Sequence, residues 1–105
     1  MKSDAITMKF DWFNAKEVES FGVEMAAFLM ERIPPAAKGE KRMASARNKD
    51  VIRKMQYKVE KFKEQNVLNF YKKAKFGNSF QWALKDSGYE DSFISELTKE
   101  LLLKM

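Results

Sequence analysis

Residues 15–33 read AKEVESFGVEMAAFLMERI, and this stretch decides the fold class. Its apolar residues recur three or four positions apart, with charged residues between them, which is typical of an amphipathic α-helix with a wide apolar face. Asn14 and Glu17 match a capping box, and Pro34-Pro35 cannot continue a helix, so the sequence predicts a helix over this whole stretch. The expected apolar face consists of Val18, Phe21, Gly22, Met25, Phe28, Leu29 and Ile33.

A second helical pattern begins near Asp50 or earlier and extends to Phe76. It contains two apolar groups, which meet at Gln65-Asn66. Because successive residues of a helix are about 100° apart around its axis, the second group points in a direction roughly 100° from that of the first. Two interpretations stay open: a continuous central helix, on the order of 50 Å long if it starts at Lys41, or a helix broken near Asn48 or Asn66. The first group is Val51, Ile52, Met55, Val59 and Phe62, and the second is Val67, Leu68, Phe70, Tyr71 and Ala74.

The rest of the chain contains signals for two shorter helices. Gly77 is suited to end the central helix, and residues 78–79 offer caps for a short helix that Ser87-Gly88 ends. A last helix is expected to begin at residues 91–92. Because Leu101–Leu103 cover most of its circumference, we expect the carboxyl end to dock on the core.

The amino-terminal segment has a different pattern. Over residues 6–12 apolar and polar side chains alternate, which favours a short strand, yet the chain offers no second strand to pair with it. Either it is an extended arm over a helical core, or it pairs with its copy in a second chain. We expect a single all-α domain, residues 1–105, with three to four helices, a long central helix, an N-terminal arm (1–13) and a basic connector (34–48).

Composition removes most catalytic chemistry. The 105 residues include no cysteine and no histidine, so thiol catalysis, zinc–thiolate sites and histidine bases are excluded. Four scattered glycines cannot supply a nucleotide-binding loop. Glu17, Glu24 and Glu31 recur at seven-residue intervals, but solvated carboxylates are the simpler interpretation than a cation site. We expect no enzymatic activity, no metal and no cofactor.

Positive charge is concentrated in the middle of the chain. Residues 38–75 contain thirteen Lys or Arg and four Asp or Glu, a net charge of +9. Such a segment can attract phosphates, or it can be a solvated helix surface whose acidic neighbours form ion pairs. Tyr57 lies nearly opposite the apolar stripe and is expected to be exposed among these bases. The candidate basic surface is Arg47, Arg53, Lys54, Lys58 and Lys61.

A continuous central helix would carry more apolar surface than this short chain can cover, which favours a homodimer. The sequence thus predicts a non-catalytic helical module that self-associates and binds another macromolecule. A nucleic-acid-binding protein is the alternative, and association with an acidic surface such as a membrane is a third. With neither a signal peptide nor an apolar stretch long enough to span a membrane, a cytoplasmic location is expected. The candidate dimer or core contacts are Ile52, Met55, Val59, Phe62, Leu101 and Leu102.

Overall fold

The computed structural model describes the backbone of residues 2–35 and 46–105, and the side chains of residues 15–35 and 48–105. This part of the chain contains no strand and is built from α-helices, so the all-α prediction is confirmed. The helices are α1 (Lys2–Arg32), α2 (Ala46–Gln65), α3 (Phe70–Asp86) and α4 (Asp91–Leu102).

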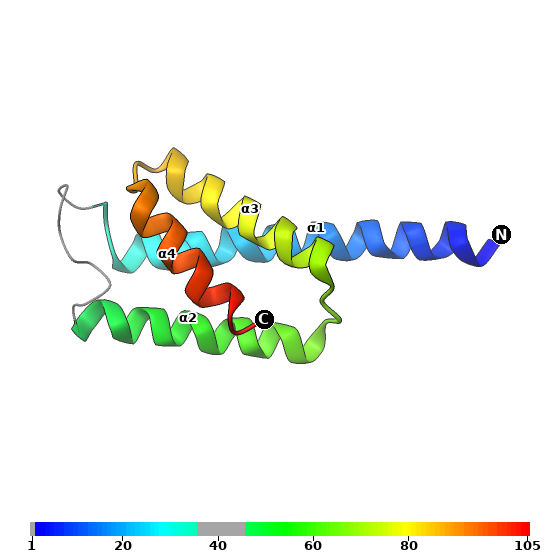
Figure 1. Ribbon diagram of the computed structural model, residues 1–105, viewed down its shortest axis with the longest axis horizontal. Coiled ribbons are helices and arrows are strands. Elements are labelled where there is room, and N and C mark those ends of the chain that lie inside the picture. Colours follow the sequence, from blue (N-terminus) through cyan, green and yellow to red (C-terminus); the bar gives the residue numbers. More distant parts are fainter. Residues whose placement is uncertain (1, 36–45) are drawn as a thin grey trace.

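The helices enclose one core. Helix α3 lies along α1, and α4 contacts both α3 and α2, while α2 packs against α1 and α4 (Figure 1). The apolar stripes predicted for 15–33 and 51–62 face this core: Met25, Leu29 and Met55 are completely buried, together with Phe76 and Phe80 of α3. Burial of these large side chains supplies most of the driving force for folding.

Helices α1 and α3 approach each other closely at Gly22. A β-carbon at this position would lie 2.0 Å from Ser79 Oγ and 2.9 Å from the carbonyl oxygen of Phe76. The absence of a side chain at Gly22 therefore permits the α1–α3 distance that buries Phe76 and Phe80.

The strand expected at residues 6–12 is wrong, because the backbone there belongs to α1. A helix makes its backbone hydrogen bonds within itself, whereas a lone strand leaves them unmade, so seven alternating residues do not suffice. Asn14 consequently lies inside α1 and does not cap it. Side chains of residues 1–14 lie outside the described residues, so the packing of the expected arm (1–13) stays a prediction.

The continuous central helix is also wrong. Helix α2 ends at Gln65 and α3 begins at Phe70, which confirms the alternative of a break at Asn66. The Asn66 side-chain amide donates to the carbonyl oxygen of Phe62 at 2.9 Å, and Asn69 Oδ1 accepts from the backbone N–H of Lys72 at 2.9 Å. These asparagines cap the two helix ends where the chain reverses.

Helix α3 runs through the stop expected at Gly77. Gly77 is buried inside the helix and faces α4, since a β-carbon at this position would lie 3.8 Å from Thr98 Cγ2. The helix ends at Asp86 instead, followed by Gly88 at φ 88°, as the signal at Ser87-Gly88 predicted.

Helix α1 ends at Arg32, directly before Ile33 and Pro34-Pro35, as predicted. Helix α2 begins at Ala46, so residues 46–48 of the connector predicted at 34–48 belong to this helix. Residues 36–45 of that connector lie outside the described residues. At the carboxyl end Leu101 and Met105 are buried and Leu102 is half-buried, so this end does dock on the core, although Leu103 is exposed.

Candidate interaction surfaces

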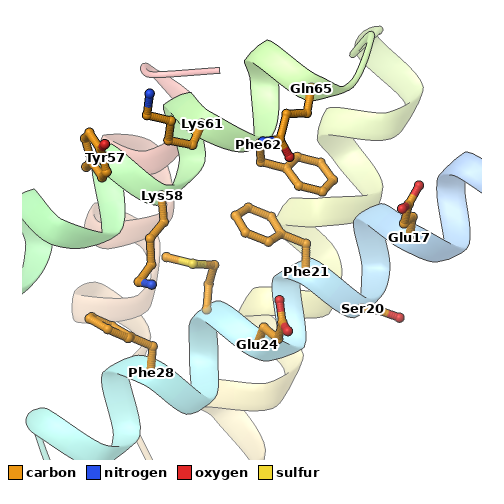
Figure 2. A pocket seen from close by; sticks show the side chains of 11 residues that line it. Glu17, Ser20, Phe21, Glu24, Phe28, Tyr57, Lys58, Lys61, Phe62 and Gln65 are labelled. Carbon is orange, nitrogen blue, oxygen red and sulfur yellow. The ribbon is translucent and has the colours of Figure 1, made fainter.

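A groove lies between α1 and α2. It has a volume of about 730 Å³, and its floor is aromatic (Figure 2). Phe21 of α1 and Phe62 of α2 stack there with their ring centroids 4.1 Å apart and their planes 5° from parallel. Phe28 extends the same floor and is half-buried, as are the two stacked rings. The groove therefore exposes part of an apolar layer that is continuous with the core.

The two rims of this groove carry opposite charges. Glu17 and Glu24 lie on the α1 side, seven residues apart and therefore on one helix face, while Lys58 and Lys61 lie on the α2 side (Figure 2). Glu17, Glu24, Lys58 and Lys61 are all exposed. The glutamates of α1 and the lysines of α2 were both noted in the sequence, but the sequence did not show that they lie across one groove from each other.

The lysines of the α2 rim lie against aromatic rings. Lys58 Nζ is 5.0 Å from the centroid of the Phe28 ring, and Lys61 Nζ is 5.4 Å from the centroid of the Tyr57 ring. Such cation–π contacts hold an ammonium near the apolar floor while leaving it accessible to solvent. Tyr57 has 61% of its surface exposed, so the prediction of an exposed tyrosine among bases is confirmed.

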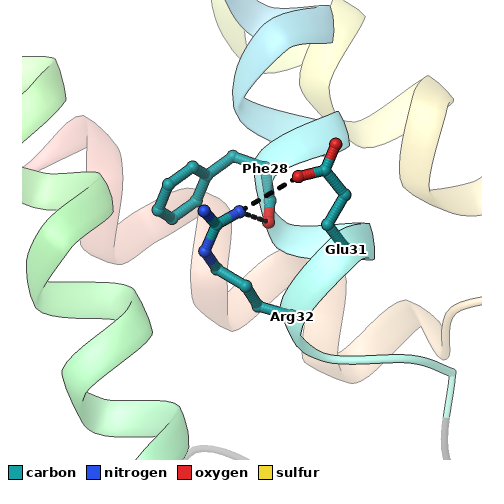
Figure 3. A network of polar contacts seen from close by, with 3 residues as sticks. All are labelled: Phe28, Glu31 and Arg32. Carbon is teal, nitrogen blue, oxygen red and sulfur yellow. Dashed lines mark hydrogen bonds and ion pairs between the residues drawn. The ribbon is translucent and has the colours of Figure 1, made fainter.

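A third cation, Arg32, lies beside the Phe28 ring near the carboxyl end of α1. The Arg32 guanidinium lies 3.7 Å from the centroid of the Phe28 ring. Its Nη1 donates to the Phe28 carbonyl oxygen at 3.0 Å and lies 3.3 Å from Glu31 Oε2 (Figure 3). A cation here satisfies a carbonyl of the last helical turn and complements the helix dipole.

The predicted basic surface is only partly assembled. Lys54, Lys58 and Lys61 share one side of α2, at three- and four-residue spacing. Lys54 Nζ lies 3.3 Å from Asp50 Oδ2, and Arg53 Nη1 lies 3.8 Å from Asp50 Oδ1. Lys61 Nζ lies 3.7 Å from Glu64 Oε1. The Arg47 side chain lies outside the described residues.

The residues predicted as dimer or core contacts are mainly core residues of a single chain. Ile52, Met55, Val59 and Leu101 are buried within the described chain, whereas Phe62 and Leu102 are half-buried and retain accessible surface. The apolar stripe of α2 thus needs no second copy to cover it. Of the contacts predicted on the central helix, Phe62, in the groove, remains a candidate for an interface.

Sequence reasoning missed a second exposed surface, on α3. Val67, Phe70 and Tyr71, which belong to the apolar group that follows Asn66, are exposed, and so is Trp82. The sequence contained one indication of this exposed surface, namely the rotation of the second apolar group relative to the stripe of α2. That rotation does not show which side of α3 is covered, and in the folded chain α1 and α4 contact the opposite side.

Neither metal chemistry nor a membrane span is indicated in the described parts of the chain. No group of three or more acidic side chains there is placed to hold a metal ion. None of the described helices is long and apolar enough to cross a bilayer. Comparison with known proteins found no matching family model, no matching curated protein and no matching solved structure.

Proposed function

We propose that the chain is a small, non-catalytic, cytoplasmic helical module that forms a homodimer through the α1–α2 groove. One observation carries the proposal: an aromatic floor lies between an acidic rim on α1 and a basic rim on α2. A surface of this kind is complementary in charge to a second copy of itself.

The geometry of self-complementarity is simple. If two copies face each other across a two-fold axis parallel to α1 and α2, each α1 lies over the α2 of the other copy. Rotation about such an axis preserves the level of every residue along the helices. Glu17 and Glu24 then approach Lys61 and Lys58 of the second copy, since these four residues line the same stretch of groove. Every contact occurs twice.

Affinity and orientation have different sources in this arrangement. Covering the exposed parts of Phe21, Phe28, Phe62 and Tyr57 removes apolar area from water, at about 25 cal/mol per Å². Exposed ion pairs contribute only about 0–1 kcal/mol each, so the four rim charges mainly select the partner and its orientation.

Nucleic-acid binding by the basic central helix receives less support. Arg53 and Lys54 both lie within ion-pair distance of Asp50, and Lys61 lies near Glu64, so acidic neighbours on α2 offset its positive charge. A phosphate backbone would have to compete with these carboxylates. That alternative predicts oligonucleotide binding that falls steeply with added salt.

Light scattering across a concentration series tests the dimer. The wild-type mass is expected to rise from 12.3 kDa toward twice that value as the concentration increases. Lys58→Glu with Lys61→Glu makes both rims acidic, so this variant is expected to stay monomeric with an unchanged helical circular dichroism spectrum.

A matched control places two reversed charges elsewhere. Glu90→Lys with Glu96→Lys alters exposed positions at and within α4, outside the groove, and is expected to dimerise like the wild type. A wild-type mass of 12.3 kDa at the highest concentration would refute the proposal.

A further inference from the structure

The outer side of α3 and the turn before it expose large apolar side chains. Val67 and Phe70 have 87% and 88% of their surfaces exposed, and Trp82 has 63%. At about 100° per residue, Phe70, Tyr71, Ala74, Asn78 and Trp82 fall within an arc of roughly 120° on the side of α3 opposite its buried residues. We call Val67 and these five residues the α3 face.

The turn that presents the first part of this face is held by hydrogen bonds. Lys72 is buried, and its Nζ donates to the carbonyl oxygen of Val67 at 3.1 Å. Asn69 caps α3 through Lys72, and the Lys73 backbone N–H donates to the Asn69 carbonyl oxygen at 3.0 Å. A fixed backbone therefore directs Val67 and Phe70 toward solvent, where leaving both exposed contributes nothing to folding.

Positive charge accompanies these apolar groups. The chain has no acidic residue between Glu64 and Asp86, whereas Lys75 and Lys85 accompany the α3 face. Lys75 Nζ lies 5.5 Å from the centroid of the Tyr71 ring. Acidic side chains lie near the two ends of the face: Glu64 lines a pocket with Val67, and Asp91 of α4 lies near Trp82 and Lys85. Helix α3 itself carries four lysines and one aspartate, so apolar side chains and positive charge occur together along it.

We propose that the α3 face binds the surface of a lipid bilayer rich in anionic headgroups. Phe70 and Val67 enter the boundary of the acyl chains, and Tyr71 and Trp82 lie at headgroup level, where amphipathic rings are favoured. The lysines attract the anionic headgroups, each contributing about fivefold to the affinity. The helix lies in the plane of the surface and does not cross the membrane.

Two features favour a bilayer over a nucleic acid. Val67 has no aromatic face on which a base can stack, and residues 54–105 contain no arginine, the residue best suited to bidentate contacts with phosphates and guanine. A fluid bilayer accepts a convex aromatic face without needing a complementary groove.

This inference does not depend on the proposed dimer. The groove is lined by residues of α1 and α2, whereas the α3 face belongs to α3 and the turn before it, so the two surfaces share no residue (Figure 1). A failure of vesicle binding would therefore leave the dimer proposal intact, and a monomeric protein could still bind vesicles.

Trp82 supplies a direct readout. The chain has two tryptophans, so Trp12→Phe leaves Trp82 as the only one. We expect vesicles of phosphatidylcholine with phosphatidylserine to shift the Trp82 emission to shorter wavelength and to sediment the protein. Vesicles of pure phosphatidylcholine are expected to do neither, and added salt should weaken the binding.

Substitutions then assign the binding to the α3 face. In the same background, Phe70→Ser with Val67→Ser is expected to lower the vesicle affinity by at least about tenfold. Both side chains are exposed, so circular dichroism should show an unchanged fold. Val23→Ser removes an exposed apolar side chain of α1 instead and is expected to bind like its parent.

Three results would overturn the proposal. The first is a Trp82 emission that does not respond to the anionic vesicles. The second is equal binding by the Phe70→Ser, Val67→Ser variant and its parent. The third is that these substitutions abolish self-association or oligonucleotide binding while vesicle binding is absent, which would assign the α3 face to a second copy or to a nucleic acid.

Discussion

Replacing either of two buried helical glycines, Gly22 or Gly77, with alanine is expected to change the free energy of unfolding, but in opposite directions. At Gly22 a methyl group would lie 2.9 Å from the Phe76 carbonyl oxygen, and a backbone atom cannot rotate away, so α1 and α3 must separate. Overpacking of this kind costs about 1–3 kcal/mol, which exceeds the gain of about 0.5–1 kcal/mol from replacing a helical glycine. Gly22→Ala is therefore expected to lower the free energy of unfolding by about 1–2 kcal/mol.

Gly77→Ala is the matched comparison. Its methyl group would lie 3.8 Å from Thr98 Cγ2 and 3.9 Å from Leu102 Cδ1, which are ordinary contact distances. Only the gain in helix propensity remains, so this variant is expected to be more stable by about 0.5–1 kcal/mol.

Thermal and urea unfolding followed by circular dichroism measure both effects, at one protein concentration because a dimer would make Tm concentration-dependent. The two variants should differ by about 2 kcal/mol, or roughly 10 °C in Tm. Adding Ser79→Ala to Gly22→Ala removes the nearest side-chain atom but not the carbonyl oxygen, so it should restore only part of the loss. Changes of the same sign at Gly22 and Gly77 would refute the close α1–α3 approach.

Three further substitutions test the turn, a buried hydrogen bond and the core. Asn69→Ala removes the cap of α3 and should destabilise the fold by about 1 kcal/mol in urea unfolding, whereas no change would mean that the cap is dispensable. Tyr89→Phe removes the hydroxyl that donates to the Ile33 carbonyl oxygen, and an unpartnered buried carbonyl should cost about 1–3 kcal/mol by the same measurement. Phe76→Ala empties a fully buried site and should cost about 3–5 kcal/mol, so a cooperative melt near the wild-type Tm would contradict its central position.

Local sequence patterns predicted a helix correctly where its apolar residues form a single stripe that packs against the core. The stripes of 15–33 and 51–62 face the core as their spacing indicated, although Phe21, Phe28 and Phe62 are only half-buried. Pro34-Pro35 and Gly88 mark helix ends as expected. These features depend only on residue type and period, and therefore a single sequence contains them.

The predicted helix boundaries that proved wrong lie where contacts between helices, and not local residue types, determine the structure. The apolar pattern rotates at Gln65-Asn66, which left a continuous helix and a break near Asn66 both open, and the folded chain resolves this choice with a reversal in which Asn66 and Asn69 cap the two helix ends. Gly77 resembles a helix end, but it lies inside α3 because α4 packs against it. Periodicity shows that two residues share a face, but not which neighbour covers that face.

The same limit explains how much of the groove could be predicted. The lysines of α2, Tyr57 and the repeating glutamates of α1 were all recognisable in the sequence. Their placement on opposite rims follows from α1 and α2 lying side by side, which is a property of the folded chain.

The most direct test of the homodimer mixes two charge-reversed variants. Glu17→Lys with Glu24→Lys makes both rims of the groove basic, and Lys58→Glu with Lys61→Glu makes both acidic, so each variant alone should remain monomeric. In an equimolar mixture every rim meets its opposite, and light scattering should show a species of twice 12.3 kDa. A mixture that stays at 12.3 kDa while the wild type dimerises would contradict the predicted arrangement of α1 over α2.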